Sequence, residues 1–229
     1  MPARKKGPED LTAKKELALE VIDRLKKEYP DAGCTLDYDH AWQLLVSVRL
    51  AAQCTDARVN IVVEDLFARY PSVAALAAAE PEDIEAIVKP CGLGHSKARD
   101  ISACMRMLRD KYNCQVPTTF EELLALPGVG RKSANLIMGD VFGEPAIVTD
   151  THCIRLCNKI GLVDGIKEPQ KVEMALWKII LPEEGSDLCH RFVMHGRAVC
   201  NARKPECEKC CLNDICRYAR EQSGADTAQ

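Results

Sequence analysis

Hydrophobic residues recur along the chain every three or four positions, which is the spacing of amphipathic α-helices. The two-residue alternation that marks a half-buried β-strand is not found in the sequence. The pattern therefore predicts an all-α protein of about ten short helices. Three apolar stripes show the spacing most clearly: Leu17, Val21 and Leu25; Val59, Val63, Leu66 and Phe67; and Ile101, Met105 and Leu108.

Capping residues and prolines place several boundaries between these helices. Thr119 and Glu122 have the spacing of a capping box, which predicts that a helix starts just after Thr119. Gly161 follows a helical run over residues 151–160 and is the residue type that commonly ends a helix. Five prolines fall between helical segments rather than inside them: Pro71, Pro81, Pro117, Pro169 and Pro182.

Composition limits the class of protein. With 229 residues, 47% of them hydrophobic, the chain can bury one large core or two small ones. No apolar run approaches the roughly 20 residues that span a bilayer. The N-terminal sequence MPARKKGPEDLTAKKE lacks the apolar segment of a signal peptide, and we interpret it as a short disordered basic tail. We expect a soluble, cytoplasmic protein with no membrane partner, associated with the nucleoid if the source is prokaryotic.

The net charge of −3 gives no general sign of nucleic-acid binding. Charge is unevenly distributed, however. Residues 191–220 contain seven basic and three acidic side chains, a local net charge of +4. Phosphate contacts need only a local positive face, so this distribution permits DNA as a partner.

Four cysteines near the C-terminus have metal-ligand spacing. Cys200, Cys207, Cys210 and Cys216 form a C-x6-C-x2-C-x5-C pattern within a largely polar segment. Disulfides are disfavoured because the chain has no export signal. Zinc is an alternative, although zinc sites usually contain two C-x2-C pairs and this segment contains one. The longer spacings favour a [4Fe-4S] cluster, in which each iron takes one thiolate.

The remaining nine cysteines show no pairing pattern, and most have apolar neighbours, where free cysteine behaves as a small hydrophobic residue. Cys211 directly follows a proposed ligand, but choosing it would change both flanking spacings. These cysteines are residues 34, 54, 91, 104, 114, 153, 157, 189 and 211.

Residues 119–142 read as a helix, a Pro-Gly-x-Gly turn and a second helix that begins near Arg131. Gly128 and Gly130 permit the left-handed backbone that such a turn requires. They also leave amide groups uncovered at a helix N-terminus, which favours binding of an anion such as a DNA phosphate. An ordinary helical hairpin is the alternative interpretation.

Lys132 and Asp150 are candidates for the chemistry. Lys132 lies in the first turn of the second hairpin helix, where the helix dipole disfavours a cation and so favours the neutral, nucleophilic amine. A phosphate-contacting surface lysine is the alternative. Asp150 precedes the helix over residues 151–160 and has the properties of an N-cap. A rigidly held capping carboxylate can also face a substrate and orient an amine or stabilise a sugar cation.

The sequences LPGVGRKSAN and VTDTH and the cysteine pattern, in this order, resemble the endonuclease III family of DNA glycosylases. The segment LLVSVRLAAQCTDARVN also matches, and the resemblance extends over residues 17–218. It implies a bifunctional enzyme that excises oxidised pyrimidines from damaged double-stranded DNA and cleaves the strand at the abasic site. We expect a monomer.

The resemblance also implies roles for individual residues. Lys132 matches the lysine that attacks C1′ and forms a Schiff base, and Asp150 matches the essential aspartate. The four patterned cysteines match the ligands of a [4Fe-4S] cluster. The residues implied in DNA binding comprise a gap-filling residue, a wedge, the hairpin glycines and two basic residues of the cysteine loop: Gln53, Leu93, Gly128, Gly130, Arg203 and Lys204.

One segment departs from the family pattern. Many members carry an aromatic residue and an asparagine after the wedge leucine, whereas this chain has Gly94 and His95. A softer intercalating loop is therefore expected, which leaves the opposite-base preference open. His95 fits a solvated histidine as well as a DNA contact. His152 follows the family pattern and is a candidate for the pocket wall.

The implied fold has two all-α domains with the active-site cleft between them. A six-helix domain over residues 34–144 contains the hairpin, and residues 1–33 with 145–229 form the cluster domain, whose cysteine loop spans residues 200–216. From the residues themselves, we expect the N-terminal helix to pack against that loop. Rival functions are an adenine glycosylase, which generally lacks the hairpin lysine, and a non-catalytic DNA-binding module or redox sensor.

Overall fold

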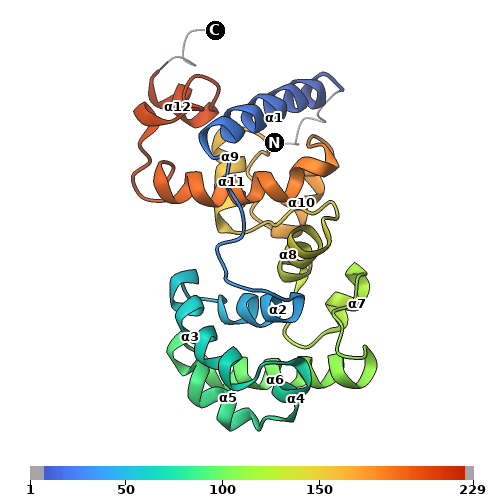
Figure 1. Ribbon diagram of the computed structural model, residues 1–229. Helices are drawn as coiled ribbons and strands as arrows, with labels where there is room; N and C mark the ends of the chain where they lie inside the picture. Colours follow the sequence, from blue (N-terminus) through green and yellow to red (C-terminus); the bar gives the residue numbers. More distant parts are fainter. Residues whose placement is uncertain (1–7, 225–229) are drawn as a thin grey trace. The chain divides into compact units, whose positions relative to one another are not determined.

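The computed structural model describes residues 8–224, and this part of the chain consists of helices and turns without a β-strand (Figure 1). The prediction of an all-α protein is confirmed. The described residues form twelve α-helices where about ten were expected, because several are a single turn or two long. Their bounds are α1 Pro8–Glu28, α2 Ala41–Leu50, α3 Asp56–Arg69, α4 Val73–Ala78, α5 Pro81–Val88, α6 Gly94–Lys111, α7 Phe120–Ala125, α8 Arg131–Phe142, α9 Thr151–Ile160, α10 Pro169–Leu176, α11 Gly185–Ala198 and α12 Arg217–Gln222. Three short 3₁₀-helices join them: η1 Lys89–Cys91, η2 Pro182–Glu184 and η3 Cys207–Lys209.

Prolines start helices more often than the sequence suggested. Pro81 and Pro169 are the first residues of α5 and α10, and Pro182 begins η2. The first turn of a helix tolerates proline because its N–H has no partner within the helix. The expectation that these prolines lie between helices was therefore wrong by one residue, whereas Pro71 and Pro117 do lie in connections.

The N-terminal segment is more ordered than predicted. Residues 8–16, interpreted from the sequence as part of a disordered tail, belong to α1. This helix buries one apolar face that includes Val21 and Leu25, both fully inaccessible. Burial of that face explains why the charged start of the segment continues as a helix. The rest of the predicted tail, residues 1–7, lies outside the described residues.

The chain divides into two compact units, Met1–Gly33 with Pro145–Gln229, and Cys34–Glu144. The second unit contains seven α-helices, α2 to α8, where six were expected, and two of them, α4 and α7, are only six residues long. Helix α6 packs against α4 and α5, and α2 packs against α8. The apolar core of this unit includes fully buried leucines and a valine from α2, α3 and α6: Leu44, Leu50, Val59, Leu66 and Leu108.

In the unit formed by both chain ends, α11 packs against α1 and α9, and α9 also contacts α12 (Figure 1). Figure 1 shows the first helix and the C-terminal segment side by side, although they come from opposite ends of the sequence. Within residues 8–224, none of the helices has the length and apolar character needed to cross a membrane.

Candidate active site and cysteine loop

The hairpin predicted over residues 119–142 is formed by α7, a five-residue turn and α8. Thr119 caps α7, since its hydroxyl oxygen accepts a hydrogen bond from the Glu122 amide. The reciprocal arm of the capping box differs from expectation, because the Thr119 hydroxyl donates to the Glu122 carboxylate at 2.8 Å. The two helices of the hairpin also contact each other, because the Arg131 guanidinium of α8 lies 5.0 Å from the centre of the Phe120 ring of α7.

The two hairpin glycines have different roles. Gly128 has a φ of +76°, and a Cβ there would lie 2.9 Å from Cβ of Asp100, so only glycine fits without rearrangement. Asp100 forms an ion pair with Arg49 beneath this turn, with Nε and Oδ2 2.7 Å apart. Gly130 has a φ of −99°, so Gly128 alone uses the left-handed backbone that both glycines permit. A Cβ at Gly130 would meet open space, which leaves room for a ligand near the backbone.

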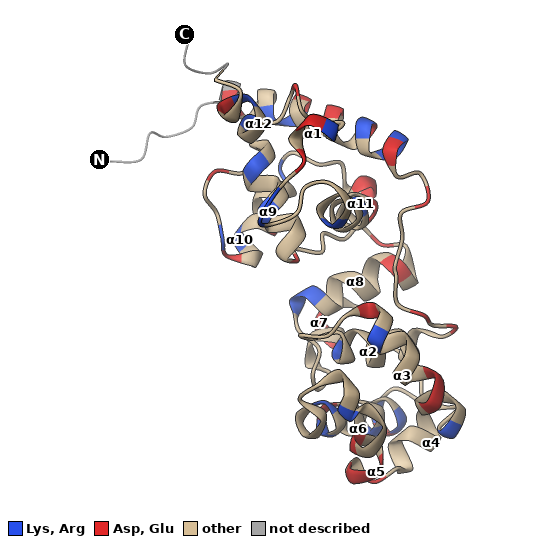
Figure 2. Cartoon of the chain, turned by 90° about the vertical axis from the view of Figure 1, so that its left-hand side faces the viewer, with Lys and Arg blue, Asp and Glu red and all other residues tan. Residues whose placement is uncertain are grey.

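Lys132 is exposed in the first turn of α8. The N-cap of this helix is Gly130, which has no side chain to cap the first amides, so the positive end of the helix is not neutralised locally. Figure 2 shows that the start of α8 is basic, in agreement with the adjacent Arg131 and Lys132. The amine is therefore accessible to a ligand that approaches the hairpin.

Asp150 is the N-cap of α9, as the sequence predicts. Its Oδ1 accepts a hydrogen bond of 2.7 Å from the amide of Cys153. The preceding residues 146–149 are buried, whereas the Asp150 side chain is half-buried. The helix then ends at Gly161 with a φ of +106°, as predicted. Lys132 belongs to the Cys34–Glu144 unit and Asp150 to the other unit.

Gln53 and Leu93 have an unusual backbone conformation. Their φ values are +58° and +49°, in the left-handed region that residues other than glycine rarely adopt. Gln53 is exposed in the turn between α2 and α3, and Leu93 is 60% exposed at the start of α6. An exposed leucine on a strained turn indicates a role outside the core.

The departure at residues 94–95 lies in the first turn of α6 rather than in a loop. A Cβ at Gly94 would lie 3.1 Å from Cα of Lys89, so glycine allows the close approach of η1. His95 is exposed, and its Nδ1 lies 2.9 Å from the Glu85 carboxylate. Both residues thus have a helical backbone, and the softer intercalating loop expected from the sequence stays a prediction.

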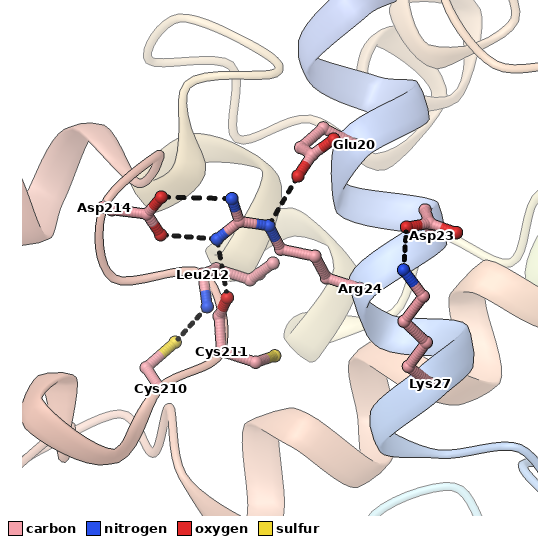
Figure 3. Close-up of polar contacts among 8 residues, drawn as sticks. All are labelled: Glu20, Asp23, Arg24, Lys27, Cys210, Cys211, Leu212 and Asp214. Atoms are coloured by element: carbon pink, nitrogen blue, oxygen red, sulfur yellow. Dashed lines mark hydrogen bonds and ion pairs between the residues drawn. The ribbon is translucent and has the colours of Figure 1, made fainter.

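The cysteine loop is anchored to α1 by Arg24 (Figure 3). The Arg24 guanidinium makes a bidentate contact with the Asp214 carboxylate, and it donates a hydrogen bond of 3.0 Å to the carbonyl of Cys211. Its Nε is held by Glu20, one turn earlier in α1, at 2.7 Å. The predicted packing of the N-terminal helix against the loop is confirmed by these contacts.

Helices α9 and α11 hold the loop at its two ends. Arg155 on α9 donates 2.8 Å and 3.2 Å hydrogen bonds to the carbonyl of Cys200 and to Nδ1 of His152. The Cys216 thiol lies 3.5 Å from the carbonyl of Lys159. The amide of Cys200 donates to the carbonyl of His195 on α11 at 2.8 Å. His152, expected as a candidate for the pocket wall, thus contacts the arginine that supports this loop.

His195 is buried between Tyr29 and a patterned cysteine. Its Nδ1 lies 3.1 Å from the Tyr29 hydroxyl, and its Nε2 lies 3.3 Å from Sγ of Cys210. Burial lowers the pKa of His195 to about 4 and raises the pKa of Tyr29 to about 12, so both side chains are neutral at pH 7. In the tautomer protonated at Nε2, the ring accepts from the Tyr29 hydroxyl and donates to the Cys210 sulfur.

The four patterned cysteines are free thiols in the same unit, with Cys216 buried and the others half-buried. Burial raises the pKa of Cys200, Cys210 and Cys216, that of Cys210 to about 12, and charges on neighbouring patterned thiols raise these values further. The thiols are thus within electrostatic range of one another. Among residues 8–224, however, no three or more His, Cys, Asp and Glu side chains are gathered closely enough to hold a metal ion, so the cluster of thiols is loose.

Arg203 and Lys204 are exposed on the loop between the first two patterned cysteines. The amide of Lys204 donates a hydrogen bond of 2.7 Å to Oδ1 of Asn201, which fixes the backbone of the turn. Both basic side chains are therefore accessible from solvent on an ordered turn.

The sequence interpretation missed three residues that support the loop, namely Arg24, Arg155 and His195. A signal existed for His195, because it follows Leu188 and Phe192 at helical spacing on the buried face of α11. A histidine on such a face needs polar partners, and a nearby cysteine pattern supplies one. Arg24 gave no comparable signal, because its partner Asp214 lies 190 residues away in the sequence.

Comparison with known proteins defines the class. Residues 46–182 match the HhH-GPD superfamily of base excision DNA repair proteins. The chain is 42% identical over 211 residues to the endonuclease III of Synechocystis sp., covering 92% of this chain and 96% of that protein. It is 38% identical over 200 residues to the endonuclease III of Escherichia coli, covering 87% and 94% of the two chains.

Solved structures agree with this relationship. A trapped endonuclease III–DNA covalent intermediate matches with a TM-score of 0.86 and 40% identity, over 91% of this chain and 98% of that one. A non-covalent endonuclease III–DNA complex matches with the same score and identity, over 92% and 98%. The helices, the hairpin and these matches define a base-excision DNA repair enzyme. Within this class, the chain belongs to the endonuclease III family, as its motifs predicted, and it is a DNA glycosylase with abasic-site lyase activity.

Proposed function

We propose that this enzyme acts as a monomer in the cytoplasm on damaged double-stranded DNA, where it excises oxidised pyrimidines and then cleaves the strand at the abasic site. The observation that carries the proposal is the exposed Lys132 amine at the uncapped start of α8, directly after a glycine turn with open space above Gly130. A phosphate bound by the hairpin amides would hold the DNA backbone close to this amine.

Lys132 is the proposed nucleophile. Its Nζ attacks C1′ of the damaged nucleotide, the bond between C1′ and the base breaks, and the base leaves with its electron pair. The sugar ring then opens to a Schiff base between C1′ and Nζ. Loss of a proton from C2′ expels the 3′ phosphate by β-elimination, and hydrolysis of the Schiff base returns the free amine.

Asp150 is proposed to provide a fixed carboxylate for this chemistry. The hydrogen bond from the Cys153 amide orients one carboxylate oxygen, while the half-buried side chain keeps contact with solvent. Such a group can stabilise positive charge that develops on the sugar, or accept a proton from the attacking amine.

Gln53 and Leu93 are proposed to replace the extruded nucleotide and to hold the strands apart. Chemistry at C1′ requires that the nucleotide leave the base stack, which costs a few kcal/mol. Both side chains are exposed on turns of the same compact unit, and an apolar side chain such as Leu93 suits a wedge between bases. Gly128 and Gly130 on the hairpin, with Arg203 and Lys204 on the cysteine loop, are proposed to contact phosphates.

We also propose a [4Fe-4S] cluster held by Cys200, Cys207, Cys210 and Cys216. The donor set fits in its chemistry, because four free thiols of one compact unit can supply the four thiolates that such a cluster needs, although the structure gathers them only loosely among residues 8–224. Supports from α1, α9 and α11 hold the loop that carries them. When bound, the cluster would supply Fe–S bonds that cross-link this loop and stiffen the turn that bears Arg203 and Lys204.

Borohydride trapping tests the proposed nucleophile. Reduction during reaction with a duplex that contains a thymine glycol fixes a Schiff base as a covalent protein–DNA adduct, which is measured on a denaturing gel. Lys132→Gln should abolish the adduct while DNA binding is retained. Lys111→Gln removes an exposed lysine at the end of α6 and should trap as the unaltered enzyme does. An undiminished adduct with Lys132→Gln would contradict the proposal.

A further inference from the structure

Lys97 is a fully buried lysine in the first half of α6, with none of its surface accessible. Its ammonium donates two hydrogen bonds of 2.8 Å, one to the carbonyl of Leu50 and one to the carbonyl of Cys91. Lysine is almost never fully buried unless it is paired, and here both acceptors are neutral carbonyl groups. The residue belongs to neither the nucleophile nor the cysteine loop, so its burial requires a separate explanation.

The position of the two carbonyls explains how the charge is tolerated. Leu50 is the last residue of α2, and Cys91 is the last residue of η1. Carbonyls at helix ends have no partner within the helix and carry partial negative charge, so a cation is favoured at both places. Burial lowers the pKa of Lys97, opposed by the nearby thiols of Cys91 and Cys54. The two charge-assisted hydrogen bonds offset part of the cost of desolvating the ammonium.

Stability alone does not account for a cation at this position. Replacing a buried charged group by a well-packed apolar residue of similar volume is often neutral or stabilising. A methionine would fill the space of the lysine stem in the apolar face of α6, next to Ala98 and Ile101. Methionine, however, has no donor that could bind the carbonyls at the ends of α2 and η1, as the lysine ammonium does.

The two joined ends lead directly into the two strained turns. Gln53 follows Leu50 by three residues, and Leu93 follows Cys91 by two. Left-handed backbone is strained for a residue other than glycine, so each turn keeps this conformation only if its surroundings enforce it. The Lys97 ammonium is a single group that fixes the start of both turns.

We propose that Lys97 is a positioning residue that holds the Gln53 and Leu93 turns in the geometry needed to open damaged duplex DNA. This inference rests on the proposed role of these two side chains in strand opening. Lys97 does not contact the reacting atoms in this proposal. It sets the spacing between the gap-filling residue and the wedge, which must enter the duplex together.

The test measures cleavage of two DNA substrates by the Lys97→Met variant. One is a fully paired duplex with an abasic site, and the other contains the same site within an unpaired bubble that needs no opening. We expect the single-turnover cleavage rate on the paired duplex to fall by about tenfold to hundredfold, because misplacement by about 1 Å can cost 10²-fold. The rate on the bubble should stay within about twofold of the unaltered enzyme, since Lys132 and Asp150 are untouched.

Matched controls separate positioning from general damage. Lys111→Met removes an exposed amine from the other end of α6 and should leave both rates unchanged. Circular dichroism melting should show that Lys97→Met is folded. If it is not, Lys97→Gln retains a neutral donor for one carbonyl and should show a smaller loss of the same kind. Equal losses on the duplex and the bubble would overturn the proposal in favour of a purely structural role.

The double variant Gln53→Ala/Leu93→Ala shows which hypothesis fails. It should lose activity on the paired duplex and retain activity on the bubble. Normal cleavage of the paired duplex by this double variant would contradict the proposed role of the two side chains. A defective double variant together with a normal Lys97→Met enzyme would contradict only the positioning role of Lys97.

Discussion

At the scale of single residues, Asp150 combines a structural bond with a negative charge that the proposed chemistry needs. The structural part is the hydrogen bond from the Cys153 amide, which starts α9. Asparagine caps helices about as well as aspartate, so Asp150→Asn should keep the fold while it removes the charge. We expect it to melt at nearly the same temperature and to lose base excision by about 10²-fold or more, as is usual for the loss of one electrostatic catalytic group.

Asp150→Ala provides the comparison, because alanine removes both the charge and the cap. It should be destabilised by about 1 kcal/mol relative to the asparagine variant, measured by urea unfolding. The rate of base excision is measured as release of the damaged base from duplex DNA. Full activity of Asp150→Asn would show that the carboxylate serves only as a cap.

At the scale of secondary-structure elements, the contact between α1 and the cysteine loop gives a prediction about how firmly the proposed cluster is retained. Arg24→Met removes the bidentate contact with Asp214 and the hydrogen bond to the Cys211 carbonyl, but keeps much of the apolar stem. We expect the loop to open more often, so that iron is lost to a chelator several-fold faster. The measurement is the decay of visible absorbance and the iron content per chain.

Lys27→Met is the matched control on the same helix. Lys27 pairs with Asp23 one turn away at 2.7 Å, and both side chains are largely exposed, so their pair adds little to the structure (Figure 3). Iron retention should therefore be unchanged in this variant. Equal rates of iron loss for Arg24→Met and the unaltered enzyme would show that α1 does not secure the loop. Stoichiometric zinc in place of iron would contradict the proposed cluster itself.

Sequence reasoning located elements well where local chemistry decides the outcome. The helical spacing of Ile101, Met105 and Leu108 identified α6, and the cap at Asp150 identified the start of α9. The prediction of side-chain partners failed where those partners are backbone groups far away in the sequence. The partners of Lys97 are carbonyls from residues 50 and 91, and carbonyls carry no sequence signature. The Pro-Gly-x-Gly turn was predicted from local sequence, but which of its two glycines takes the left-handed backbone was not: it is Gly128, whereas Gly130 has a φ of −99°.

At the scale of the whole molecule, net charge and local charge give opposite indications about DNA. The chain carries a net charge of −3, yet residues 191–220 carry seven basic and three acidic side chains. Both Arg203 and Lys204 are exposed within this region, on a turn that the Asn201 side chain fixes. DNA binding should therefore depend on a few local phosphate contacts rather than on overall attraction.

The salt dependence of binding tests this inference. Each lost phosphate contact reduces the slope of log K against log salt by about 0.9, so Arg203→Ala/Lys204→Ala should lower it by about 1.8. Affinity should fall for all sequences alike, measured by fluorescence anisotropy on damaged and undamaged duplexes. Lys171→Ala/Lys178→Ala removes two other exposed lysines from the same unit and should leave the slope nearly unchanged. The same decrease in both double variants would mean that overall charge governs binding, and the cysteine loop would then have no specific role in contacting phosphates.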